Sequence, residues 1–129
     1  MKASIRTASV LLGVLCLHAP IVVAQTQAPP AADGQQRLVG SGGMTLYTYD
    51  PDGNRGRSQC DGACAALWPP YLAAAGAKVE DGFGLVTRSD HRLQWSYRGR
   101  PLYRYAGDTA PGTTQGDGVN GNWHVARIH

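Results

Sequence analysis

The chain has 129 residues, with 12 Lys and Arg against 9 Asp and Glu, and 17 of the residues are glycine. This length suits one domain, and the charged fraction of 16% excludes a charge-driven disordered chain, a coiled coil and a collagen. The composition is typical of a small, turn-rich, mainly β domain.

Residues 1–24 have the pattern of a secretory signal peptide. A basic start precedes the short apolar run Val10–Leu17, and Val22 and Ala24 occupy the −3 and −1 positions of a small-residue cleavage site. The alternative is a membrane anchor, but the run is short for one and His18 and Pro20 follow it closely. We therefore predict cleavage after Ala24, export to the periplasm or the extracellular space, and no transmembrane segment in the mature chain.

Cys16 lies at the end of the apolar run, where bacterial lipoproteins carry a lipid anchor. A lipidated cysteine normally follows a small residue, whereas Leu15 precedes this one. We therefore expect no lipid anchor through Cys16.

Removal of the leader leaves 10 basic against 9 acidic residues and no run of Lys or Arg. A nearly neutral chain offers no electrostatic case for nucleic acid as a partner.

The segment 25–36 follows the leader and is predicted to be a flexible linker. It contains Pro29-Pro30 and Asp33-Gly34 but no aromatic residue, so it carries too little apolar surface to offset its ordering entropy. A single folded domain is then expected over residues 37–129.

The body of the chain repeats itself at an offset of 56 residues. Nine identities fall in the twenty positions Gly43–Gly62 without a gap, and one further residue of shift brings Trp68 onto Trp123. This self-similarity predicts two pseudo-equivalent β-rich repeats, at about 38–88 and 93–128. The matched motif residues are Tyr47, Tyr49, Asp52 and Trp68 in the first copy and Tyr103, Tyr105, Asp108 and Trp123 in the second.

Each copy contains a strand that ends in Leu-Tyr-x-Tyr, and alternation with period two places its two tyrosines on one face. A turn with an Asp, a Gly-rich loop and a Trp follow in both copies. Segments 93–97 and 101–105 flank Gly99 and predict a hairpin, and 83–87 and 123–128 are predicted to be further short strands.

The two copies differ after the Gly-rich loop. The first copy is Ala-rich and predicts a short helix near 61–68, with Asp61 as a possible cap and Pro69-Pro70 as its stop. The second copy has Gly and Asn there, which are poor helix formers. The predicted fold class is therefore α+β, mainly β.

At these residues the sequence resembles a family of small secreted bacterial repeat proteins, often lipoproteins, marked by a Tyr-x-(Phe/Trp/Tyr)-x-x-Asp motif. The motif stands at 47–52 and 103–108, and further family segments match 60–70, 107–112 and 121–125. The resemblance implies a cell-envelope location and the repeat. It transfers no activity and no catalytic residue, because the family's function is not established.

Cys60 and Cys64 are the two cysteines that remain after the leader, and a pair in an exported protein predicts a disulfide. A bond at this spacing requires Cys60 to precede the helix in extended or turn geometry, where Gly62 helps. The bond would pin the loop Gly53–Gln59 to the helix start. A redox-active pair and a pair of metal ligands are the alternatives.

His91 and His124 are weak candidate metal ligands with the two cysteines, because no two histidines have helical spacing. Asp50-Pro51-Asp52-Gly53-Asn54 resembles the opening of a calcium loop but lacks its later acidic ligand. The chain shows no catalytic motif, so we predict no enzyme activity and no cofactor.

Six Tyr and three Trp against one Phe suit either a small core with hydrogen-bonded edges or a ligand platform. The prediction is a non-enzymatic binding or structural module, with an unidentified small ligand or envelope protein as its partner. The alternative is a redox or metal-handling envelope protein that uses Cys60 and Cys64 with a histidine.

Overall fold

The structure is a computed structural model that describes residues 4–5, 7–18 and 27–129. The predicted cleavage site at Val22–Gln25 lies outside the described residues. Residues 4–5 and 7–18 form no helix or strand, and their large apolar side chains are exposed. None of the helices in the described residues has both the length and the apolar character needed to cross a membrane.

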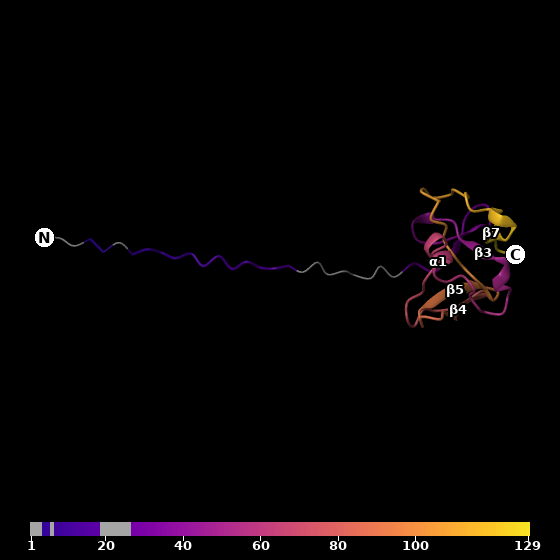
Figure 1. The fold of residues 1–129 in the computed structure, drawn as a ribbon, viewed down its shortest axis with the longest axis horizontal. Coiled ribbons are helices and arrows are strands. Elements are labelled where there is room, and N and C mark those ends of the chain that lie inside the picture. The colour runs from indigo at the N-terminus through magenta and orange to yellow at the C-terminus, as the bar shows by residue number, and fades with distance from the viewer. Residues whose placement is uncertain (1–3, 6, 19–26) are drawn as a thin grey trace.

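The described residues form three small antiparallel sheets and one short α-helix (Figure 1). The fold is α+β and mainly β, as the sequence predicts. The sheets consist of β1 (Ala31–Ala32) with β2 (Leu38–Val39), of β3 (Tyr47–Tyr49) with β7 (Trp123–Val125), and of β4 (Phe83–Thr87) with β5 (Leu93–Tyr97) and β6 (Arg100–Pro101). The α-helix α1 spans Ala63–Leu67, and 3-10 turns lie at Ser41–Gly43, Asp50–Asp52 and Val119–Gly121.

The predicted hairpin is present, and its turn has the expected chemistry. Tyr97 pairs with Arg100, so the connection consists of the two residues Arg98 and Gly99, whose φ angles are 48° and 79°. Two consecutive positive φ angles are typical of a type I′ turn, which matches the twist of the flanking strands.

Two predicted strands are shorter in the structure. The C-terminal strand ends at Val125, and one isolated bridge between Arg37 and Arg127 continues its direction. In the second copy the Tyr-x-Tyr segment is an isolated bridge at Tyr103, which pairs with both Tyr47 and Pro70. Strand propensity therefore predicts longer strands than the structure contains. In the second copy the reason is that the neighbouring segments pair with the chain only at Tyr103.

The linker prediction is wrong for residues 27–36. The backbone carbonyl of Ala28 accepts a hydrogen bond of 2.6 Å from the Tyr71 hydroxyl, and the Gln27 side chain accepts one of 2.6 Å from the Leu72 amide. Asp33 closes a turn onto Arg37, and β1 pairs with β2. The segment has few apolar side chains, but its polar groups form hydrogen bonds with the folded domain. The ordered part of the chain therefore begins by residue 27 rather than at 37.

The two copies meet at a pair of equivalent residues. The Tyr47 amide donates to the Tyr103 carbonyl at 2.8 Å, and the Tyr103 amide donates back to the Tyr47 carbonyl at 2.9 Å. This reciprocal pair of bonds between equivalent residues relates the two copies by a pseudo-two-fold axis.

In each copy, the segment after the motif tryptophan forms backbone hydrogen bonds with the other copy. Tyr71 follows the motif residue Trp68 of the first copy, yet its amide donates to the Leu102 carbonyl of the second copy at 2.9 Å. Ala126 ends the second copy, and its amide donates to the Leu46 carbonyl of the first copy at 2.9 Å. The copies are therefore interlocked, and neither contains all of its own backbone partners.

Two clusters of buried side chains fill the domain. One contains Trp95 and Tyr71 with the aliphatic residues of both copies, and the other contains the motif aromatics with Cys60. The second cluster lies where the two copies cross.

Candidate functional site

The motif tyrosine of each copy is bonded to the motif aspartate of the other. The Tyr47 hydroxyl donates to Asp108 Oδ2 at 2.6 Å, and the Tyr103 hydroxyl donates to Asp52 Oδ2 at 2.5 Å. The second oxygen of each carboxylate accepts a backbone amide seven residues later, at Gln59 and Gln115. The spacing of the motif is thus explained, because each Asp closes its own loop and anchors the partner copy's tyrosine.

These groups are buried, which alters their protonation. Both tyrosines are 0% exposed, and burial with the adjacent carboxylate raises the pKa of each hydroxyl well above the ordinary 10.0. Burial also raises the pKa of Asp52, against the hydrogen bonds from Tyr103 and the Gln59 amide, which lower it. The Tyr47 and Tyr103 hydroxyls and the two motif carboxylates thus bind one another and nearby backbone amides across the two copies.

The remaining motif aromatics form a four-ring stack across the pseudo-two-fold axis. Trp68 and Trp123 lie 3.8 Å apart between centroids and within 2° of parallel. Tyr49 stacks on Trp123, and Tyr105 stacks on Trp68, each at 4.3 Å. Tyr49 and Tyr105 thus each pack on the tryptophan of the other copy. The four rings belong to the core, and the two tyrosines are half-buried at the ends of the stack.

The predicted disulfide is present. Cys60 and Cys64 are bonded, with Cα atoms 5.3 Å apart. Cys60 precedes α1, and Gly62 has a φ of +57°, so the chain turns before the helix as the spacing requires. Cys16, which lies in the described residues 7–18, is an exposed free cysteine.

The predicted cap on this helix is wrong. The N-cap is Gly62, which has no side chain, and Asp61 forms no cap hydrogen bond. Asp61 instead pairs with Arg88, where the Asp61 Oδ1 atom lies 2.9 Å from Nη2. A charged partner in the other half of the chain outcompetes the local cap.

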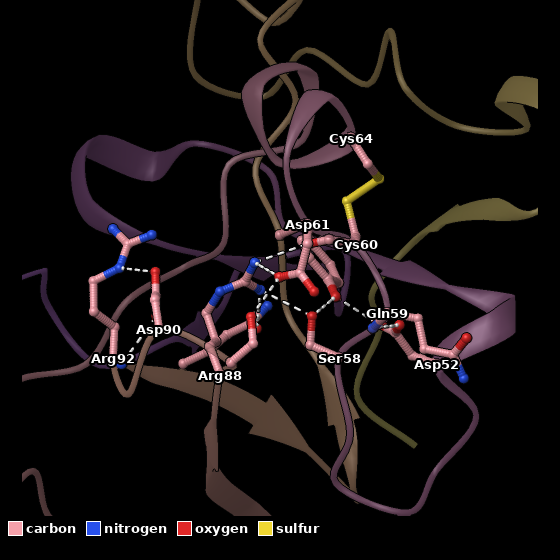
Figure 2. A network of polar contacts seen from close by, with 12 residues as sticks. Asp52, Ser58, Gln59, Cys60, Asp61, Cys64, Arg88, Asp90 and Arg92 are labelled. Carbon is pink, nitrogen blue, oxygen red and sulfur yellow. Dashed lines mark hydrogen bonds and ion pairs between the residues drawn. A yellow bond between two sulfur atoms is a disulfide. The ribbon is translucent and has the colours of Figure 1, made fainter.

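Arg88 is buried and ties the disulfide loop to the sheet. Figure 2 shows its guanidinium pointing at Asp61, Ser58 and the backbone of Cys60. Arg88 also donates to the Gln94 side chain at 2.8 Å. Its side chain is 2% exposed, so this network fixes the loop that carries Cys60 against β4 and β5.

The described residues do not gather the candidate histidines, cysteines and aspartates into one cluster. His91 is exposed at a turn, and His124 pairs at 2.9 Å with Asp50 on the face opposite the buried Trp123. Asp52, the other acid of the calcium-like turn, is taken by Tyr103. Across 4–5, 7–18 and 27–129, no cluster of three His, Cys, Asp or Glu residues has the geometry to hold a metal ion.

A cleft of about 350 Å³ lies between the hairpin and β7, and we call it the basic cleft. Its charged and titratable lining residues are Arg98, Arg100, Arg127, His124, His129 and Asp50. Tyr97 forms part of its wall, and the Arg98 guanidinium lies 5.5 Å from the centre of its ring. The Tyr97 hydroxyl donates to the backbone oxygen of His129 at 3.2 Å.

The three arginines of the basic cleft form no ion pair within the described part of the chain. Arg127 makes one long hydrogen bond, 3.3 Å, to the backbone of Gln35. The acidic side chain beside them, Asp50, is already engaged by His124. The cleft therefore presents unneutralised guanidinium groups, which suit carboxylate and phosphate.

The sequence reasoning missed these arginines. They come from a turn, a strand end and the C-terminal segment, which are far apart in the chain, and the offset of 56 aligns none of them with another arginine. A signal was present, since Arg-Gly-Arg occurs twice, at 55–57 and 98–100.

Comparison with known families identifies the chain's relatives. A family model described as a secreted repeat of unknown function matches residues 31–71 and 84–127, which is about two thirds of the chain in two separate hits. The chain belongs to this family. Searches of curated proteins and of solved structures gave no match. Family membership indicates an exported protein and confirms the duplication. The first match of this secreted-repeat protein begins at Ala31 in β1, which agrees with the early start of the ordered segment.

Proposed function

We propose that the secreted-repeat protein is a non-enzymatic binding module of the cell envelope that holds an anionic group in the basic cleft. The observation that carries the proposal is the set of three guanidinium groups around one cleft without an ion pair in the described residues. Like charges held close together repel, and a bound anion would relieve that repulsion.

The cleft is supported by a rigid scaffold. Arg98 and Arg100 flank the tip of a two-residue hairpin, and His124 lies in β7, which is paired residue by residue with β3. Arg127 follows Ala126, whose amide is bonded to Leu46 of the other copy. The binding groups are thus positioned before a ligand arrives, which reduces the entropy cost of binding.

The cysteines favour a structural role over the alternative redox or metal-handling function. Cys60 is 0% exposed and packs with the motif aromatics. His124 lies in the basic cleft, hydrogen-bonded to Asp50, and the cysteines do not line that cleft. The disulfide is therefore assigned to hold the loop that Arg88 also holds.

Isothermal titration calorimetry with inorganic phosphate at low ionic strength tests the proposal. We expect saturable binding that weakens about tenfold in an Arg100→Gln/Arg127→Gln variant, because about 1.4 kcal/mol of charge-assisted contact is lost. A Lys78→Gln/Arg92→Gln variant removes the same charge outside the basic cleft and should bind like the wild type. Absence of phosphate binding, or an equal loss in this control, would overturn the proposal.

A further inference from the structure

The two Arg-Gly-Arg segments meet at their central glycines. The Gly56 amide donates to the Gly99 carbonyl at 2.9 Å. A Cβ atom on Gly99 would lie 2.1 Å from the Asn54 carbonyl oxygen, and its φ of +79° also favours glycine. The loop and the hairpin turn can therefore approach this closely only because that position has no side chain.

This contact gathers four arginines, which we call the arginine ridge: Arg55, Arg57, Arg98 and Arg100. The first three are exposed and Arg100 is half-buried. None of the four has an ion pair in the described residues. The ridge brings together positive charge from two segments that are distant in sequence, with no acidic partner to neutralise it.

The ridge arginines line two hollows. Arg55 and Arg57 line one of about 620 Å³, and Arg98 and Arg100 line the basic cleft on the other side. The acid in the first hollow is Asp52, which is buried and accepts from Tyr103 and the Gln59 amide. Both hollows therefore offer guanidinium groups to an anion, and the segments that carry these groups are joined by the backbone hydrogen bond from Gly56 to Gly99.

We propose that the arginine ridge binds a linear polyanion, a polymer of the cell envelope with regularly spaced phosphate or carboxylate groups, laid across both hollows. This inference rests on the proposed function and extends it from one anion to a chain. A single small anion occupies one hollow and leaves the other arginine pair without a partner. A chain of repeated charges satisfies both pairs at once and gains affinity through the linkage.

The physical signature of such binding is its dependence on salt. Each phosphate neutralised on a flexible polyanion releases condensed counterions and contributes about 0.7 to the slope of log K against log salt. Loss of two ridge arginines should therefore lower the magnitude of that slope by about 1.4.

The test compares orthophosphate, tripolyphosphate and medium-chain linear polyphosphate at equal phosphate concentration over a series of salt concentrations. We expect affinity to rise with chain length. In an Arg55→Gln/Arg57→Gln variant, polyphosphate binding should weaken about tenfold, whereas orthophosphate should keep its affinity for the basic cleft, which Arg55 and Arg57 do not line. The Lys78→Gln/Arg92→Gln variant controls for net charge, and circular dichroism of each variant confirms that it is folded.

The outcomes separate the two proposals. Equal affinity for all three chain lengths, or wild-type polyphosphate binding by Arg55→Gln/Arg57→Gln, overturns the polyanion inference and leaves the anion cleft standing. Polyphosphate binding that ignores Arg100→Gln/Arg127→Gln overturns the cleft. A parallel measurement with phosphatidylglycerol vesicles tests whether the anionic groups belong to a lipid surface. Tighter binding to the vesicles than to polyphosphate would also overturn the proposal of a linear polymer.

Discussion

Replacement of Tyr103 by Phe tests whether the exchanged tyrosine–aspartate bonds hold the two copies together. The substitution removes one hydroxyl, which donates to Asp52 Oδ2 and contacts Ser58 Oγ at 2.7 Å. It keeps the ring that packs edge-on against Trp123. The change is thus confined to the polar contact between the copies.

The expected cost follows from the burial of the partner. Asp52 is 5% exposed and keeps the Gln59 amide as a hydrogen-bond donor after the substitution. A hydrogen bond to a charged group contributes about 1.5–3 kcal/mol, so we expect the free energy of unfolding to fall by about 2 kcal/mol. Tyr47→Phe should cost a similar amount, because its partner Asp108 is 8% exposed and equally held.

Urea unfolding followed by tryptophan fluorescence and circular dichroism measures both variants. Tyr49→Phe and Tyr105→Phe are matched controls, since these tyrosines stack on tryptophans and their hydroxyls form no side-chain hydrogen bond in the described residues. The controls should stay within about 0.5 kcal/mol of the wild type. Equal losses in motif and control variants would refute the reasoning, as would two separate transitions, because interlocked copies should unfold together.

Three further effects are expected. Replacing Cys60 and Cys64 by Ala should lower the free energy of unfolding by about 1–3 kcal/mol, measured by urea unfolding of the oxidised protein and the variant, because the loop that the disulfide closes is short; an unchanged midpoint would contradict this. Arg88→Met should lower the free energy of unfolding by about 3 kcal/mol, because a buried hydrogen-bond network loses its central side chain. Arg92→Met breaks an exposed pair with Asp90 and should lower it by less than about 0.5 kcal/mol. Similar shifts of the thermal unfolding midpoint in the two variants would contradict this. Tyr47 and Tyr103 have a pKa raised above 10.0 in the folded state, so their contribution to the free energy of unfolding is complete below pH 10. It is lost as the pH rises above 10, by up to about 2.7 kcal/mol per pH unit for the pair. Absorbance at alkaline pH should show the two tyrosines ionising together with unfolding, and their ionisation in the folded state would contradict this.

The local features of the fold could be predicted from the sequence. The hairpin around Gly99, the strand at 83–87 and the short helix are encoded by turn residues, by alternation and by an Ala-rich run that ends at Pro69. The disulfide could be predicted because Cys60 and Cys64 are the two cysteines outside the predicted signal peptide. Each of these depends on residues close together in the chain.

The contacts between the copies could not be predicted in the same way. The offset of 56 shows that Tyr47 and Tyr103 play one role, but it does not show that each binds the aspartate of the other copy. The docking of residues 27–36 depends on Tyr71, and the position of Asp61 depends on Arg88. The arginine ridge was missed for the same reason, because one long-range backbone hydrogen bond assembles it.

An NMR titration of the isotope-labelled mature domain with inorganic phosphate tests most directly whether the interlocked scaffold presents an anion site. We predict saturable shifts of backbone amides concentrated at Arg98–Arg100 and at His124–Arg127, which line the basic cleft. Shifts concentrated around Cys60 and Cys64, shifts scattered over the whole domain, or no shifts at all would contradict it.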